Sequence, residues 1–255
     1  MTTISISSLK LFKACRQAWR FKYIEGLEPV RPADALIVGS NYHSKLEDIY
    51  NKGYCDVSDN SRESAMALAY EKYIYPRFKV TSAEEWIEYP LGNGNRLVGR
   101  VDGIAEDGHL VEHKTTSMNI TDEYEYELQW DEQVLAYMLA TGTRKMWYTV
   151  IKKPTIRQKK NESDEDFFIR MCQWYDDDTS SKVKVFEISR TDDEISEFEK
   201  QLKSMVRIMK RAENSKNEPL YRNPLYCKCW GKRCEYSSIC LNYDPTKEYI
   251  EFTKR

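Results

Sequence analysis

The segment that most constrains this 255-residue chain is GRVDGIAEDGHLVEHKTTS, residues 99–117. Apolar residues flank the dipeptide Asp107-Gly108, which is typical of a tight turn between two strands. A similar turn signal, Gly92-Asn93-Gly94-Asn95, lies just upstream. The sequence therefore predicts an antiparallel meander of three strands, over about residues 85–91, 96–104 and 109–115.

Three charged side chains of this segment are expected to converge. Glu112 and Lys114 are two residues apart, so they project from one face of a strand, and His113 projects from the other. In a hairpin of this length Asp102 can lie near Glu112. Two carboxylates and an ammonium suit a Mg²⁺ or Mn²⁺ site that hydrolyses phosphodiesters. On spacing alone, an exposed cross-strand ion pair is the more common arrangement.

In the segments before and after the meander, apolar residues recur at helical spacing. Strands are expected at residues 145–152 and 183–189, and Thr191 is the expected N-cap of the last helix. This order predicts a mixed α/β core over residues 1–215 and a small cysteine-rich element over 216–255. The expected helices run from Ser7 or Ser8 to near Gly26, and over residues 41–50, 62–75, 122–140, 162–174 and 192–212.

Composition excludes some classes of protein. Charged residues make up 31% of the chain, but the net charge is −2, which argues against a protein that coats nucleic acid by charge alone. No stretch approaches the roughly 20 apolar residues of a membrane span, and the N-terminus lacks the pattern of a secretory signal. We therefore expect no membrane partner and a cytoplasmic location, where the seven cysteines would stay reduced.

Four of these cysteines crowd into 14 positions of the segment YRNPLYCKCWGKRCEYSSICLNY. They are Cys227, Cys229, Cys234 and Cys240. Thiolates at such density in a reducing compartment are typical of a zinc site or an iron–sulfur cluster.

The central segment resembles the PD-(D/E)XK nuclease superfamily, in which a G-x-x-D strand precedes an E-x-K strand. Gly99, Asp102, Glu112 and Lys114 match these two motifs. The resemblance implies a restriction-endonuclease-like α/β fold, with a central mixed sheet flanked by helices. It also implies that Asp102, Glu112 and Lys114 are catalytic.

Further elements, in the correct order, resemble the RecB-like branch that includes CRISPR-associated exonucleases. Gly39 and His43 match its G-x-x-x-H segment, and Gln133 and Tyr137 match its Q-x-x-x-Y helix. The resemblance implies that His43 joins Asp102 and Glu112 as a metal ligand and that Gln133 and Tyr137 assist catalysis. Gln129, one turn before Gln133, is a rival for the glutamine role.

In this branch an N-terminal cysteine joins three C-terminal cysteines around a 4Fe-4S cluster. The resemblance implies Cys15, Cys234 and Cys240 as ligands. The usual spacing would place the remaining cysteine at position 231, which is glycine here, so Cys229 or Cys227 is expected instead. A local zinc site of the four C-terminal cysteines is the alternative.

The resemblance thus implies a Mg²⁺- or Mn²⁺-dependent DNA nuclease, expected to be an exonuclease, acting on single strands or duplex ends in recombination or repair. The sequence has no helicase motif, so a helicase or recombination partner would supply any unwinding. The alternatives are a catalytically silent nucleic-acid-binding module and an interaction protein stapled by zinc.

Overall fold

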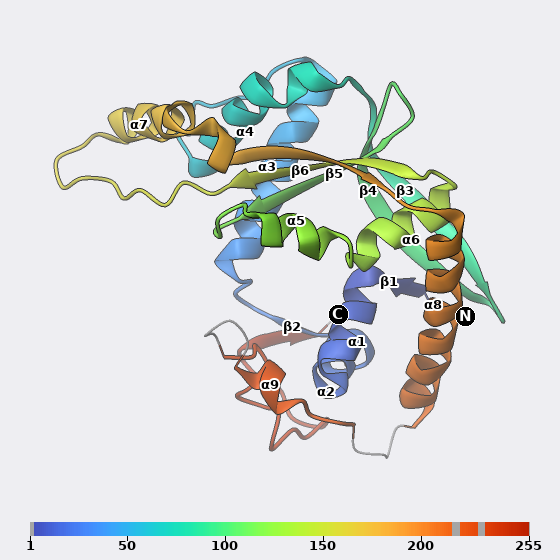
Figure 1. Ribbon diagram of the computed structural model, residues 1–255. Coiled ribbons are helices and arrows are strands. Elements are labelled where there is room, and N and C mark those ends of the chain that lie inside the picture. The colour runs from blue at the N-terminus through green and yellow to red at the C-terminus, as the bar shows by residue number, and fades with distance from the viewer. Residues whose placement is uncertain (1–2, 216–219, 229–232, 255) are drawn as a thin grey trace. The chain divides into compact units, whose positions relative to one another are not determined.

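The computed structural model describes residues 3–215, 220–228 and 233–254 (Figure 1). Its contacts divide the chain into two compact units. We call Asp34–Ile87 with Gly99–Ser196 the central unit, and Met1–Ala33, Glu88–Val98 and Glu197–Arg255 the terminal unit. The predicted division into residues 1–215 and 216–255 stays a prediction.

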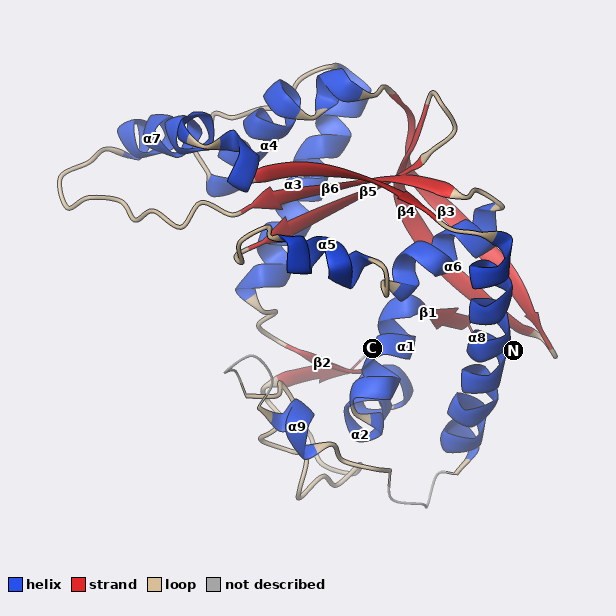
Figure 2. Ribbon diagram, in the orientation of Figure 1, coloured by secondary structure: helices blue, strands red, loops and turns tan. Residues whose placement is uncertain are grey.

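The central unit is built on a mixed sheet (Figure 2). β4 (Asn95–Ala105) pairs antiparallel with β5 (Leu110–Thr116), and β3 (Val80–Gly92) pairs with β4. β5 pairs in parallel with β6 (Lys145–Lys152), which pairs antiparallel with β7 (Val183–Ser189). The prediction of a mixed sheet is confirmed. The first strand of the predicted meander, β3, begins five residues earlier than expected, at Val80.

The parallel pairing of β5 and β6 requires a long crossover between them. α5 (Asp122–Leu128) and α6 (Glu132–Thr141) form it and cover one face of the sheet (Figure 1). The single helix expected over residues 122–140 is wrong, because Asp131 begins a new helix. Its backbone is extended and its carboxylate accepts a hydrogen bond from the Gln133 amide at 2.9 Å.

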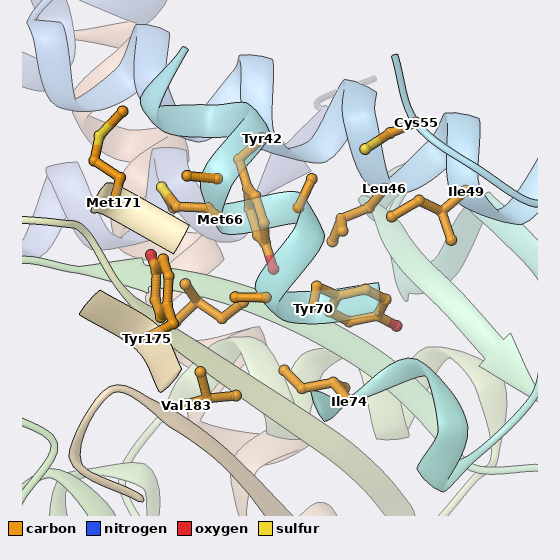
Figure 3. Packing of buried hydrophobic residues seen from close by; sticks show 14 of the residues in the cluster. Tyr42, Leu46, Ile49, Cys55, Met66, Tyr70, Ile74, Met171, Tyr175 and Val183 are labelled. Carbon is orange, nitrogen blue, oxygen red and sulfur yellow. The ribbon is translucent and has the colours of Figure 1, made fainter. Parts of the chain in front are cut away.

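The opposite face of the sheet is covered by α3 (Asp34–Lys52), α4 (Arg62–Tyr73) and α7 (Asp164–Asp177). Short 3₁₀ turns, Tyr75–Arg77 and Thr179–Ser181, follow α4 and α7. Side chains of the three helices form the core of the unit on this face, with Val183 of β7 among them (Figure 3). Since both faces of β5 are covered, Leu110, Val111, Glu112 and His113 are all buried.

The terminal unit begins with β1 (Thr3–Ser5), which pairs in parallel with the start of β4. α1 (Ile6–Ala14) and α2 (Arg16–Trp19) follow, then a π-helical turn, Arg20–Ile24. The single helix expected up to Gly26 is interrupted at Cys15, whose backbone is extended.

The remaining elements of the terminal unit come from distant parts of the chain. β2 (Leu27–Pro29) pairs antiparallel with β8 (Phe252–Lys254), and the short α9 (Pro224–Cys227) precedes the last cysteines. α8 (Asp192–Asn214) starts in the central unit and continues here, capped by Thr191 as predicted. Phe21, Leu27, Tyr236 and Ile239 are buried together in this unit. None of the described helices is long and apolar enough to cross a membrane.

Candidate active site

β5 presents Glu112 and Lys114 towards α6, as the alternation of side chains along a strand requires. The Lys114 ammonium donates to Oε1 of Glu112 and, at 3.0 Å, to Oε1 of Gln133. Gln133 Nε2 donates to the same Glu112 oxygen at 2.8 Å. The first turn of α6 therefore fixes both charged side chains of the E-x-K strand.

Tyr137, one turn beyond Gln133, extends this network to β4. Its hydroxyl accepts from Gln133 Nε2 at 2.9 Å and donates to the backbone carbonyl of Arg100 at 2.9 Å. The Tyr137 ring also explains Gly99, because a Cβ atom at this glycine would lie 2.8 Å from Tyr137 Cε1. The predicted G-x-x-D and Q-x-x-x-Y motifs thus meet in space.

The carboxylate of Glu112 is buried and only partly hydrogen-bonded. It is 2% exposed, and its second oxygen, Oε2, has no hydrogen-bond partner in the described part of the chain. Burial, followed by repulsion from Asp102, raises the pKa of Glu112 to about 7, although Lys114 acts in the opposite direction. A buried carboxylate oxygen without a partner is costly, and a cation beside it would remove that cost.

Asp102 lies on β4 between two partners. Its Oδ2 accepts a hydrogen bond from the backbone N–H of His113 at 2.7 Å, and its Oδ1 lies 3.2 Å from Nδ1 of His43 on α3. Burial raises the pKa of Asp102, but the hydrogen bond and charge of His43 outweigh burial and hold this pKa below its ordinary value. Burial likewise lowers the pKa of His43, and Asp102 raises it by more. The predicted ligands His43 and Asp102 are therefore in direct contact.

Sequence reasoning missed Glu84, on β3. Ligand atoms of Glu84, His43 and Asp102 all lie within 4.8 Å of one another, whereas Glu112 is outside this group. Nothing in the sequence distinguishes Glu84 from the adjacent Glu85. Only the pairing of β3 with β4 brings it to the site.

The central unit thus holds all six of the predicted residues that are not cysteines around one carboxylate-rich centre. Asp102 and Glu112 offer hard oxygen atoms, which suit Mg²⁺ or Mn²⁺, and His43 adds an imidazole nitrogen. Lys114 places a positive charge beside these oxygens. This set can bind a divalent cation and an anionic substrate together.

The candidate cluster ligands Cys15, Cys227, Cys234 and Cys240 lie in the terminal unit. Cys15 is buried, and its Sγ lies 4.0 Å from the carbonyl of Tyr221. Burial raises the pKa of Cys234 to about 11, with smaller contributions from Cys15 and Cys227, so these thiols are close enough to interact. Cys240 is affected by the same two thiols. The predicted ligand Cys229 lies outside the described residues.

Several solved structures are similar to this chain. A putative exonuclease from Eubacterium rectale is 14% identical, with 97% of this chain and 90% of that chain covered, at a TM-score of 0.56. An alkaline exonuclease from Laribacter hongkongensis is 15% identical, with 83% and 90% covered, at 0.38. A phage-related exonuclease from Haemophilus somnus is 16% identical, with 78% and 92% covered, at 0.39.

No curated protein matches the sequence. The sequence profile of one family does match, over residues 3–77 and 60–241, and these ranges include every predicted site residue from Cys15 to Cys240. This match extends over most of the chain, and the geometry of Asp102, Glu112 and Lys114 agrees with the motifs that define the family. The chain belongs to the PD-(D/E)XK nuclease superfamily.

Proposed function

We propose that the protein is a metal-dependent DNA nuclease, and specifically an exonuclease, whose active site is the centre around Asp102, Glu112 and Lys114. The observation that carries the proposal is Oε2 of Glu112, which has no hydrogen-bond partner in the part of the chain that the structure describes. This oxygen is buried beside a second carboxylate, whereas the side chains of Asp102 and Lys114 have partners. Such an arrangement is costly in the protein alone and is accounted for by a bound cation.

The proposal assigns a task to each residue. Asp102 and Glu112 hold the cation, with His43 beside them, and a bound Mg²⁺ or Mn²⁺ would activate water and offset phosphate charge. Lys114, whose side chain is 30% exposed, can reach an anionic phosphate oxygen while keeping its bond to Glu112. Gln133 and Tyr137 are positioning residues: Gln133 holds the side chains of Glu112 and Lys114 in place, and Tyr137 holds Gln133.

Support for exonuclease activity comes from the Eubacterium rectale structure, which has the same fold along nearly its whole length and is described as a putative exonuclease. We propose DNA, either single strands or duplex ends, as the substrate. Membership of the RecB-like branch and a helicase or recombination partner remain predictions from the resemblance.

The experiment is digestion of three DNA substrates by the full chain with Mn²⁺ or Mg²⁺. The substrates are end-labelled linear single strands, linear duplex and closed circular duplex, and EDTA serves as the blank. We expect release of nucleotides from linear DNA and no attack on the closed circle. Lys114→Ala provides the inactive control.

Each other outcome has a definite meaning. Cleavage of the closed circle would show that the protein is an endonuclease and not an exonuclease. Binding of DNA without cleavage at any metal concentration would contradict the nuclease and favour a catalytically silent binding module. Activity in Lys114→Ala equal to that of the wild type would remove the site assignment.

We also propose that Cys15, Cys234 and Cys240, with Cys229 or Cys227, bind a 4Fe-4S cluster that ties the first helices to the tail. Contacts between these segments support it, because the Asn223 side chain donates to the carbonyl of Ala14 at 2.8 Å. A cluster joining residues so far apart in sequence would stabilise the fold mainly by restricting the unfolded chain.

Protein purified without oxygen tests this second proposal. A cluster predicts a brown protein with broad absorption near ~400 nm, bleached by Cys15→Ser. Stoichiometric zinc without iron, together with an indifferent Cys15→Ser variant, would establish the alternative zinc site, which would leave an interaction role for the tail open to test.

A further inference from the structure

Glu84 is an acidic residue at the centre that the sequence motifs do not include. It lies on β3, and its carboxylate is within 4.8 Å of ligand atoms of both His43 and Asp102. Its side chain is 18% exposed, so it faces the protein more than the solvent. Glu84 therefore belongs to the centre by position.

The backbone of Glu84 is strained. Its φ of +58° is in the left-handed region, where the other described residues with side chains are Asn60 and Asn93. Asparagine tolerates this conformation, whereas for glutamate it costs on the order of 1–2 kcal/mol. Such a residue inside a strand persists where the surroundings determine the direction of its side chain.

One oxygen of Glu84 is held from the solvent side. Arg100, on β4, places its Nε 2.5 Å from Glu84 Oε2, and the Arg100 side chain is 64% exposed. This ion pair orients the carboxylate and leaves its other oxygen, Oε1, for a second interaction. A partly exposed pair by itself contributes at most about 1 kcal/mol, which does not account for the strained backbone.

Glu112 supplies an independent observation that a cation would fit this centre. Its Oε1 is occupied by Lys114 and Gln133, and its buried Oε2 has no partner among the described residues. Glu112 is not in the group formed by Glu84, His43 and Asp102. Asp102 interacts with Glu112 and is a member of that group, so it can serve two adjacent cation positions.

We propose that Glu84 is a metal ligand, which with His43 and Asp102 forms a second cation position separate from the one between Asp102 and Glu112. The inference rests on the proposed nuclease function. Three carboxylates balance most of the charge of two divalent cations, and a substrate phosphate supplies the rest. Paired cations about 3.5–4 Å apart that share a carboxylate are a known arrangement for phosphodiester hydrolysis.

The two positions differ in chemistry. The position of Asp102 and Glu112 offers oxygen atoms alone, which suit Mg²⁺. The position of Glu84 includes the imidazole of His43, a ligand that favours transition metals. Mn²⁺ is therefore expected to fill both positions, and Mg²⁺ to bind the Glu84 position more weakly.

Titration of the full chain with Mn²⁺ tests this inference without reference to activity. Calorimetry and the electron paramagnetic resonance of free Mn²⁺ monitor the binding. We expect two Mn²⁺ ions per wild-type chain. Glu84→Gln should bind one, or bind the second at least about tenfold more weakly. Glu85→Gln changes the adjacent, exposed glutamate in the same way and should bind two.

Two further variants separate a ligand from a structural ion pair. Arg100→Gln breaks the same ion pair but should keep both Mn²⁺ ions. Glu84→Gly relieves the strained backbone, so in EDTA it should melt close to the wild type while gaining less from Mn²⁺. This variant keeps the test valid if Glu84→Gln folds poorly.

Equal Mn²⁺ stoichiometry and affinity in wild type and Glu84→Gln would overturn the inference. A loss of the second ion in Arg100→Gln as large as in Glu84→Gln would also overturn it, because the ion pair would then be the relevant feature. These results are distinct from failure of the proposed function, in which the wild type itself would bind no divalent cation or cleave no DNA.

Discussion

The two faces of β5 each carry a buried polar side chain, but only one of these two side chains, His113, has all its polar atoms paired. On the face towards α3 and α4, His113 is 1% exposed and both ring nitrogens are paired, with the Tyr50 hydroxyl at 2.7 Å and the Thr149 hydroxyl at 2.6 Å. On the face towards α6, Glu112 is also buried, and its Oε2 has no partner among the residues that the structure describes. We call these the closed face and the open face.

The difference shows how one strand serves packing and chemistry together. A fully paired polar network in the interior adds rigidity and specifies one arrangement of the core. The paired His113 side chain does this on the closed face, and its backbone N–H also donates to Asp102. The open face lacks such closure, so it can accept a cation and a phosphate. We infer that the closed face holds the strands in the register that the open face requires.

The largest expected effect is on the open face, in Asp102→Asn. This change keeps the size of the side chain but removes a ligand charge shared by both proposed cation positions. Cleavage should fall by ~10⁴-fold or more while the metal-free protein melts near the wild-type temperature. Digestion assays and melting curves in EDTA measure the two quantities. Cleavage within tenfold of the wild type would contradict the idea that the open face is the active site.

Lys114→Met should produce the next largest effect. If Lys114 stabilises charge that develops on the phosphate, turnover should fall by ~10²–10³-fold with little change in DNA affinity. Lys145→Met, an exposed lysine of β6, is the matched control. Single-turnover kinetics and binding in Ca²⁺ separate the two quantities. Lost affinity with normal turnover at saturation would instead make Lys114 a substrate-gripping residue.

The third prediction is that the two faces give metal-free stability opposite dependences on pH. Burial raises the pKa of Glu112 from 4.5 to about 7, so the folded state binds that proton more tightly than the unfolded state. Its contribution is present below pH 4.5 and is lost as pH rises through 7. Burial lowers the pKa of His113 from 6.5 to about 3, so its contribution is present above pH 6.5 and is lost as pH falls towards 3.

Melting in EDTA between pH 3 and 8 measures this dependence. These differences in pKa correspond to at most about 3 kcal/mol for Glu112 and about 5 kcal/mol for His113. Glu112→Gln should abolish the loss of stability between pH 4.5 and 7 and keep the loss on the acid side. An unchanged dependence of melting on pH in Glu112→Gln would show that water or other groups offset the burial of Glu112. The contrast between the two faces would then be wrong.

Much of this arrangement could be predicted from the sequence because it depends on local periodicity. Two-residue spacing placed Glu112 and Lys114 on one face, and four-residue spacing placed Gln133 and Tyr137 on one side of a helix. Both placements agree with the structure. The order of strands and helices predicted a mixed α/β core, and the resemblance implied the central mixed sheet that the structure has.

What could not be predicted depends on pairing between distant segments. Glu84 reaches the centre only through the pairing of β3 with β4, and the closed face depends on the hydrogen-bond partners that α3 and β6 supply to His113. Competition between a capping side chain and helix propensity broke the expected helix at Asp131. Propensity and spacing carry no information on such long-range contacts.

The smallest expected effects come from removing one hydroxyl from each face, in Thr149→Val and Tyr137→Phe. Thr149 is 1% exposed and its hydroxyl pairs with Nδ1 of His113, so Thr149→Val leaves a buried nitrogen unpaired and should cost about 1–2 kcal/mol of stability. Cleavage at low temperature should stay within about threefold of the wild type, because the Glu112 face is untouched.

Tyr137→Phe removes a bond to Gln133 and a bond to the carbonyl of Arg100. Its stability loss should be about 1 kcal/mol, but turnover should fall about tenfold because Gln133 then holds Glu112 and Lys114 less firmly. If both variants lost stability and turnover in the same proportion, the two faces would form one network, and the separation of packing from chemistry along β5 would be wrong.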